Sequence, residues 1–152
     1  MLYFFLRKTH SLCREAVTLW KVDERHIPIR VDDDIVDARL AARGMAEELG
    51  FSGTNLVLIA TAVSEVARNI VEYASQGEVI LAPADAHRKG IAVIARDEGP
   101  GIANVARAMV PGYSTSRGLG LGLPGARRLM DEFEIVSRVG VGTTVTMRKW
   151  LS

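Results

Sequence analysis

A long segment of regular helical periodicity is the feature that most constrains the fold of this chain. Between Thr54 and Ala74, apolar residues recur three and four positions apart, which is the spacing of one face of an α-helix. Gly77 follows and is expected to end the helix. A single apolar stripe must be buried against another layer, so the segment predicts a helix packed on a sheet or on other helices. The residues of the stripe are Leu56, Ile59, Ala60, Val63, Ala67, Ile70, Val71 and Ala74.

The other patterns predict strands and helices that do not alternate regularly. Residues 91–96 are an almost continuous apolar run, which is typical of a strand at the centre of a sheet. The expected order is β-α-α-β-β-α-β-β. We therefore expect an α+β fold, a two-layer α/β sandwich with one mixed sheet and helices on one face. The expected strands are residues 26–31, 79–82, 91–96, 134–138 and 143–149. Further helices are expected at 32–49 and 124–132, a single helical turn at 104–109 and a loop at 83–90.

Length, charge and cysteine content exclude several classes of protein. The 152 residues suffice for one domain, expected at 25–152 after an N-terminal extension of residues 1–24. With 19 Lys and Arg against 18 Asp and Glu, the net charge is +1, which argues against a nucleic-acid or membrane partner. Cys13 is the only cysteine, so no disulfide framework is expected. No apolar stretch approaches the roughly 18 residues of a spanning helix. We expect a cytoplasmic protein.

The long helix carries the first group of candidate functional residues. Glu65 and Asn69 point away from the apolar stripe and are one turn apart, so their side chains are neighbours. An acid and an amide in this arrangement could act as general base and Mg²⁺ ligand, because magnesium prefers oxygen donors. An isolated Glu-x-x-x-Asn pattern is also common on a solvated helix face.

A second candidate group follows the apolar strand, in Asp97-Glu-Gly-Pro-Gly101. A carboxylate at the end of a buried strand can accept a hydrogen bond from a ligand amine. Gly99 and Gly101 would let the backbone approach a planar group without side-chain obstruction. Taken alone, the motif also reads as an ordinary turn.

The third candidate group is the glycine-rich stretch from Gly118 to Gly125, which leads into a predicted helix. Glycines before a helix N-terminus offer backbone N–H groups and a favourable dipole to phosphates, and residues 114–116 add hydroxyl donors. A plain loop with good helix-entry chemistry would look similar. The stretch formally matches a dinucleotide fingerprint, but a polar loop precedes it and fewer than thirty residues follow, which excludes a Rossmann fold.

In this order, the three groups resemble the ATP-binding fold shared by gyrase, heat-shock chaperones, histidine kinases and MutL, the GHKL superfamily. Residues 65–69 match its N box, 97–101 its first glycine box and 118–122 its second, while Gly142-Thr143 matches the terminal Gly-Thr element. The resemblance sharpens to one branch, the RsbT-like anti-sigma regulatory switch kinases of bacterial stress-response modules. It covers roughly residues 26–151, and the segments that carry it are 64–70, 112–116 and 120–133.

This resemblance implies a serine/threonine-protein kinase that uses ATP and Mg²⁺. Glu65 would orient or deprotonate the attacking hydroxyl, Asn69 would hold Mg²⁺ against the phosphates, and Asp97 would accept from the adenine amino group. Residues 114–122 would close as a lid that orders when ATP binds. The nucleotide-binding residues implied are Asn69, Asp97, Gly99, Gly101, Ser114, Thr115, Gly118, Leu119, Gly120, Leu121, Gly122 and Thr143.

The resemblance also implies partners. The protein substrate would be a small STAS-domain antagonist, and a PP2C-type phosphatase would be bound and activated. The main alternative is an anti-sigma factor of the same fold that sequesters a sigma subunit; the sequences Ser114-Thr-Ser116 and Leu123-Pro-Gly125 favour the switch kinase. A detached histidine-kinase module is weakened by the lack of a dimerisation helix with an acceptor histidine. A purely structural domain leaves three aligned motifs unexplained.

Overall fold

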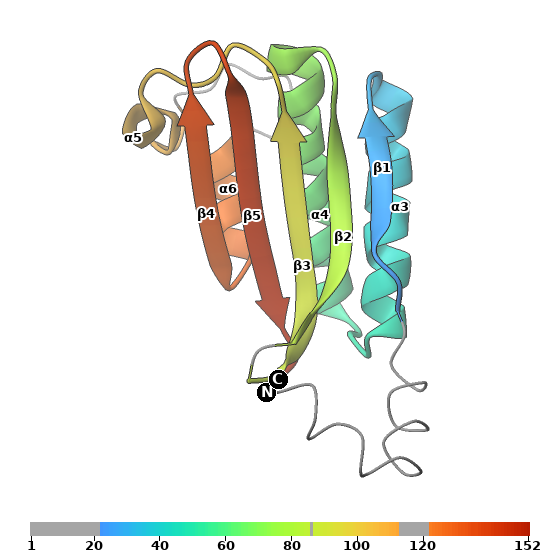
Figure 1. Ribbon diagram of the computed structural model, residues 1–152. Coiled ribbons are helices and arrows are strands. Elements are labelled where there is room, and N and C mark those ends of the chain that lie inside the picture. The colour runs from blue at the N-terminus through green and yellow to red at the C-terminus, as the bar shows by residue number, and fades with distance from the viewer. Residues whose placement is uncertain (1–21, 86, 113–121) are drawn as a thin grey trace, which may run out of the picture.

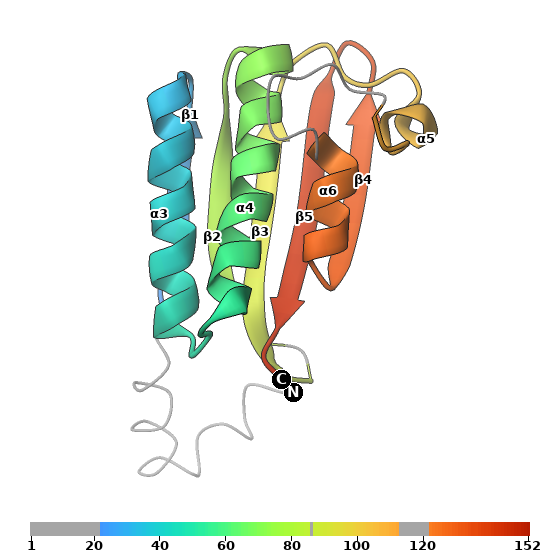
Figure 2. The ribbon, with the colours of Figure 1, turned by 180° about the vertical axis from the view of Figure 1, so that it is seen from behind.

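The fold consists of two layers, a five-stranded sheet and a layer of helices that covers one of its faces. The computed structural model describes residues 22–85, 87–112 and 122–152. Figure 1 views the open face of the sheet. Figure 2 views the face covered by α3 (Asp32–Glu48), α4 (Thr54–Asn69) and α6 (Gly122–Leu129). This confirms the α+β, two-layer expectation. The N-terminal extension predicted at residues 1–24 lies almost entirely outside the described residues and stays a prediction.

The strand order in the sheet is β1-β2-β3-β5-β4, and every neighbouring pair is antiparallel. The expectation of a mixed sheet was therefore wrong. Strands β3 and β4 run in the same direction, but β5 lies between them and pairs antiparallel with both, so no parallel pair forms. The strands are β1 (Arg25–Ile29), β2 (Gly77–Asp85), β3 (Lys89–Asp97), β4 (Glu132–Arg138) and β5 (Gly142–Trp150).

Helix α3 (Asp32–Glu48) begins at a well-formed N-terminus. The sequence predicts that acidic residues cap this helix, and Asp34 Oδ2 accepts the backbone N–H groups of Arg30 at 2.8 Å and Val31 at 3.0 Å. These two hydrogen bonds hold the pKa of the Asp34 carboxyl below its ordinary value. The buried side of α3 presents small residues such as Ala38 and Ala42, which let it pack closely beside α4.

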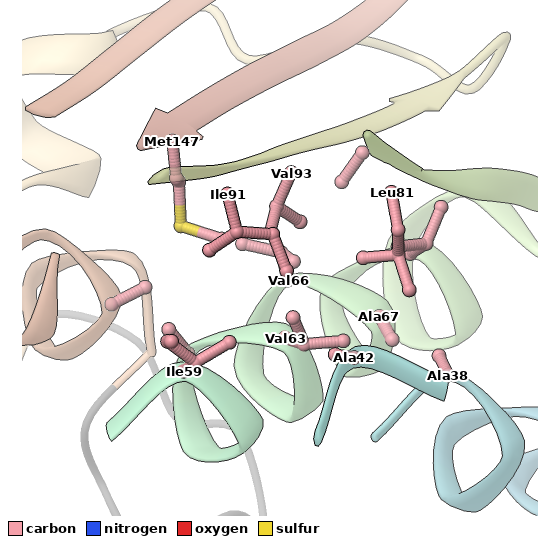
Figure 3. Close-up of a cluster of buried hydrophobic side chains, with 14 of the residues drawn as sticks. Ala38, Ala42, Ile59, Val63, Val66, Ala67, Leu81, Ile91, Val93 and Met147 are labelled. Carbon is pink, nitrogen blue, oxygen red and sulfur yellow. The ribbon is translucent and has the colours of Figure 1, made fainter. Parts of the chain in front are cut away.

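Helix α4 (Thr54–Asn69) occupies the centre of the helix layer, as its apolar stripe predicts. Ile59, Val63 and Val66 of α4 face Ile91, Val93 and Met147 of the sheet in the core (Figure 3). A π-helix, η1 (Ile70–Ala74), continues α4. Among the described residues, Thr54–Ala74 is the one helix long and apolar enough for a membrane span, but half of its most apolar window is buried inside this domain. Its apolarity is explained by the core.

Two boundaries differ clearly from those expected from the sequence, whereas the expected helical turn is present. The predicted loop at 83–90 is mostly strand, because β2 and β3 pair from Gly77↔Asp97 to Asp85↔Lys89 in one long hairpin. The last helix, α6, spans Gly122–Leu129 instead of 124–132, since Glu132 already belongs to β4. The predicted turn near 104–109 is the short helix α5 (Val105–Ala108), whose first turn is capped by Asn104 Oδ1 accepting Arg107 N–H at 3.0 Å.

The C-terminal end of α6 is fastened to the end of β5 by polar contacts. Asp131 Oδ2 accepts Trp150 N–H at 2.8 Å, and Lys149 Nζ donates to the Leu129 carbonyl at 3.1 Å and to Asp131 Oδ1 at 3.3 Å. The Trp150 indole N–H donates to Glu132 Oε1 at 2.9 Å. We call this set of residues 129–132 and 149–150 the C-terminal clamp.

Candidate functional site

A cavity of about 520 Å³ lies at the end of the sheet opposite the C-terminal clamp. It lies between the helix layer, where α4 continues into η1, and the ends of β3 and β5. Its walls are apolar, with a few polar side chains from Asn69, Tyr73, Asp97 and Thr143. This is the composition of a small-molecule site, in which a few polar groups fix the orientation of a largely apolar ligand. The lining residues are Val66, Asn69, Ile70, Tyr73, Ala74, Ala95, Asp97, Pro100, Gly101, Ile102, Ala108, Leu123, Thr143 and Val145.

Asp97 is the last residue of β3 and lines the cavity. Its Oδ1 accepts the backbone N–H of Gly99 at 2.8 Å, which fixes the carboxylate and leaves Oδ2 to accept from a ligand. Gly99 itself does not line the cavity. A Cβ at Gly99 would lie 2.6 Å from the Ala74 Cβ, so the absence of a side chain lets the loop after β3 pack directly on η1.

Gly101 lines the cavity with a φ of +75°, a conformation that favours glycine. A Cβ at this position would also collide with the backbone of Arg138. The tip of the β4–β5 hairpin lies against this loop, where Gly140 N–H donates to the Pro100 carbonyl at 2.9 Å. The loop is thus held between η1 on one side and the hairpin on the other.

Thr143, from the predicted Gly-Thr element, lies beside Asp97 in the β3–β5 register and lines the cavity. Its hydroxyl forms a hydrogen bond with the hydroxyl of Ser137 on β4, with a distance of 2.8 Å between Thr143 Oγ1 and Ser137 Oγ. Ser137 was missed at the sequence level, because a single serine within an alternating strand carries no functional signal. Its contacts emerge only when the hairpin brings the two strands together.

Glu65 and Asn69, one turn apart on α4, have different environments. Asn69 lines the cavity. Glu65 does not; its side chain is 3% exposed, and its Oε2 accepts the backbone N–H of Gly122 at 3.0 Å while Oε1 accepts from Arg68 Nη1 at 3.1 Å. At Glu65 this helix face is therefore not solvated, because the start of α6 covers it.

Most of the predicted lid lies outside the described residues. Ser114, Thr115, Gly118, Leu119, Gly120 and Leu121 all belong to that part of the chain. Gly122 is the exception: it is buried as the first residue of α6, and its N–H is directed at Glu65 rather than at the cavity. The described structure thus joins the first, second and last predicted motifs at one end of the sheet.

Most of the chain is similar to known proteins. A family model described as "histidine kinase-like ATPase domain" matches residues 27–149. The serine/threonine-protein kinase RsbT of Bacillus subtilis (strain 168) is 48% identical over 130 residues, which cover 85% of this chain and 98% of the relative. The chain belongs to the RsbT family of serine/threonine-protein kinases. The anti-sigma F factor of Halalkalibacterium halodurans is 31% identical over 121 residues, covering 76% of this chain and 83% of the relative.

Solved structures agree with the RsbT family fold. The RsbU and RsbW domains of Rv1364c from Mycobacterium tuberculosis superpose with a TM-score of 0.61 at 21% identity, covering 86% of this chain and 33% of that chain. Full-length ShkA in complex with AMPPNP superposes with a TM-score of 0.52 at 19% identity, covering 84% of this chain and 31% of that one. The chain thus spans about a third of these larger proteins, and the likeness shows the common fold.

The residues of this RsbT-family cavity fit the use of ATP, which membership of an ATP-binding kinase family supports. Asp97 offers an acceptor at one end, the apolar walls suit a purine ring, and Asn69 offers an amide oxygen. No group of three or more His, Cys, Asp or Glu side chains suited to a metal exists among the described residues. Magnesium fits such a site nevertheless, since it commonly binds through one or two protein oxygens, substrate phosphates and waters.

Sequence reasoning missed the apolar wall of the cavity. Ile70 was expected only as a member of the apolar stripe, and Val66 was not singled out; both pack in the core and also line the cavity. Tyr73 and Ala74 reach the cavity from η1, and no residue in the sequence marks the change from α-helix to π-helix. The sequence hints at this wall only in two small residues, Ala74 and Gly99, because their close contact leaves no room for a side chain at Gly99.

Proposed function

We propose that this kinase binds ATP with Mg²⁺ in the cavity at the end of β3 and transfers the γ-phosphoryl group to a partner protein. The observation that supports this most is the placement of Asp97, Thr143 and Asn69 around one apolar cavity of about 520 Å³. Asp97 Oδ2 would accept the adenine amino group, and Thr143 and Gly101 would lie beside the base. Asn69 would hold Mg²⁺, which when bound neutralises charge on the phosphates.

Glu65 is the proposed general base. One of its oxygens would accept the proton of the substrate's serine or threonine hydroxyl. The hydroxyl oxygen attacks the γ-phosphorus, and the bond between the γ-phosphoryl group and ADP breaks. Each Glu65 oxygen accepts one hydrogen bond, from Gly122 N–H at 3.0 Å or from Arg68 Nη1 at 3.1 Å, and keeps a second lone pair for a proton. Because the side chain is only 3% exposed, the start of α6 would have to move before a substrate hydroxyl could reach it. Because phosphoryl transfer depends chiefly on positioning and charge stabilisation, one acid and one magnesium ligand can suffice.

The proposed substrate is a STAS-domain antagonist protein in the cytoplasm, and the kinase would also bind and activate a PP2C-type phosphatase. Support comes from the relative named RsbT, which this chain matches over nearly its whole length, and from a structural neighbour that joins an RsbU domain to an RsbW domain. A balanced net charge of +1 fits a protein partner better than a nucleic acid or a membrane.

A second candidate function is sequestration of a sigma subunit, favoured by the 31% identity to an anti-sigma F factor. Incubation with labelled ATP and candidate STAS-domain and sigma partners separates the two candidate functions. We expect the protein to phosphorylate a STAS-domain partner and not to retain a sigma subunit. Retention of sigma without phosphate transfer to any STAS protein would contradict the proposal, and Glu65→Gln is the control that separates transfer from binding.

A further inference from the structure

Ser137 is the hub of a hydrogen-bond network at one end of the cavity. It lies on β4, paired with Thr143 of β5 in the hairpin register, and its side chain is half-buried. Its Oγ is 2.7 Å from Ile102 N, 2.8 Å from Thr143 Oγ1 and 3.3 Å from the Gly142 carbonyl oxygen. Two of these partners, Ile102 and Thr143, line the cavity, whereas Ser137 does not. Ser137 therefore acts on the cavity through its neighbours.

The number of protons in this network decides which group donates. A serine hydroxyl has one hydrogen and two acceptor lone pairs. The Ile102 N–H can only donate, so it occupies one lone pair of Ser137, and the Gly142 carbonyl can only accept, so it takes the Ser137 hydrogen. The remaining lone pair of Ser137 then takes the hydrogen of the Thr143 hydroxyl. This is the assignment in which all three contacts are hydrogen bonds.

The assignment fixes what Thr143 presents to the cavity. With its hydrogen directed at Ser137, Thr143 Oγ1 can only accept a hydrogen bond from a ligand. Asp97, which lies directly opposite Thr143 in the β3–β5 register, also presents an acceptor, because Gly99 N–H occupies its Oδ1 and leaves Oδ2. Two adjacent acceptors match an amino group, and they are poorly matched to a carbonyl oxygen.

We propose that Ser137 is a positioning residue that holds Thr143 as an acceptor and thereby makes the cavity select a purine with an amino group at C6. The proposal rests on the proposed binding of ATP in this cavity. Without Ser137, the Thr143 hydroxyl is free to rotate and donate, so the site can accommodate a C6 carbonyl as well as an amino group.

The test compares the affinities of the full-length protein for ATP and for inosine triphosphate, which carries a carbonyl at C6, by calorimetry with Mg²⁺. We expect the wild type to prefer ATP and Ser137→Ala to reduce this preference roughly tenfold. Ser137→Thr keeps the hydroxyl and should therefore keep the wild-type preference for ATP over inosine triphosphate. In a Thr143→Val background, Ser137→Ala should change the preference no further, because the group that it positions is gone.

The outcomes separate the inference from the proposed function. Equal loss of affinity for both nucleotides in Ser137→Ala, or an unchanged preference, overturns the role of Ser137 while ATP binding stands. A wild type that binds neither nucleotide overturns the proposed function and this inference with it. If Ser137→Ala does not fold, Ser137→Cys, which keeps the size of the side chain but only a weak donor, takes its place with the same two outcomes.

Discussion

The two ends of the sheet are built in different ways. At the C-terminal clamp, polar groups are paired with one another: Asp131 binds the Trp150 backbone and Lys149, and the Trp150 indole binds Glu132. Arg88 lies over the Trp150 ring, 5.5 Å from its centroid. At the cavity end, Asp97 keeps one oxygen for a ligand and Asn69 faces the cavity. Satisfied polar groups stabilise the fold, whereas groups held in place but left open can bind a substrate.

The contrast extends to the two ends of α6. At its C-terminal end, Lys149 Nζ donates a hydrogen bond to the Leu129 carbonyl, and this contact serves the fold. At its N-terminal end, the Gly122 N–H donates a hydrogen bond to Glu65, the proposed catalytic base. A contact made by a reactive group can be exchanged during the reaction, so the start of α6 is the end that we expect to respond to substrate. The following predictions test this division of labour, from the largest expected effect to the smallest.

Glu65→Gln should reduce phosphate transfer to the partner by about 10²–10⁴-fold, because an amide cannot accept the proton of the attacking hydroxyl. ATP affinity should stay close to that of the wild type, since the carbonyl of the introduced glutamine can still accept the Gly122 N–H and keep α6 in place. Single-turnover transfer and calorimetry measure the two effects. Glu134→Gln, on the exposed side of β4, is the matched control. Normal transfer by Glu65→Gln would show that this carboxylate is structural.

Asp97→Asn should weaken ATP binding by roughly 10–100-fold, which corresponds to the 1.5–3 kcal/mol of one charged hydrogen bond. The protein should remain folded, because the amide oxygen can still accept the Gly99 N–H. Calorimetry of the folded variant gives the affinity, and circular dichroism monitors the fold. Unchanged ATP affinity would remove Asp97 from the base-binding end of the cavity.

Asp131→Ala should have the opposite effect, lowering the stability of the fold without changing ATP affinity. The Trp150 N–H, on a residue only 9% exposed, loses its acceptor, and Lys149 loses its ion pair, so the free energy of unfolding should fall by about 1 kcal/mol. ATP affinity should not change, because the clamp and the cavity are at opposite ends of the sheet. Urea denaturation and calorimetry measure the two quantities. A loss of ATP affinity without a loss of stability would contradict the separation of the two ends.

The smallest expected effect is a pH dependence at the first strand. Hydrogen bonds to Glu78, and then to Glu24, raise the pKa of His26 above its ordinary value. The stabilisation is fully present below the unfolded pKa of about 6.5 and is lost as the pH rises through the raised folded value. The urea midpoint of the wild type should therefore exceed that of His26→Gln at pH 5.5, and the two should converge at pH 8.5. A constant difference would exclude a role for protonation.

Most of the fold could be predicted from the sequence, because local periodicity encodes it. The stripe from Leu56 to Ala74 predicted the central helix, and the apolar run at 91–96 predicted the central strand. Strand pairing could not be predicted in the same way, since it depends on which segments meet across the sheet: β5 lies between β3 and β4, which run in the same direction. The mixed sheet was the error that followed.

The candidate site was predictable only where a motif lies next to an element boundary. Asp97 at the end of a strand and Thr143 in the hairpin do line one cavity, together with Asn69 and Gly101. The burial of Glu65 could not be predicted, because α6 covers it from 57 residues further along the chain. Ser137 gave no signal, since its importance comes entirely from the partners that pairing brings to it.

Mapping the ATP site by amide chemical shifts tests the central claim most directly. Two-dimensional ¹H–¹⁵N spectra of the labelled protein would be recorded during a titration with ATP and Mg²⁺. We expect the largest changes at Asn69, Asp97, Gly101 and Thr143, and little change at Asp131 and Trp150. Changes centred on the C-terminal clamp or on the open face of the sheet, or no changes at saturating ATP, would contradict the assignment of the cavity as the nucleotide site.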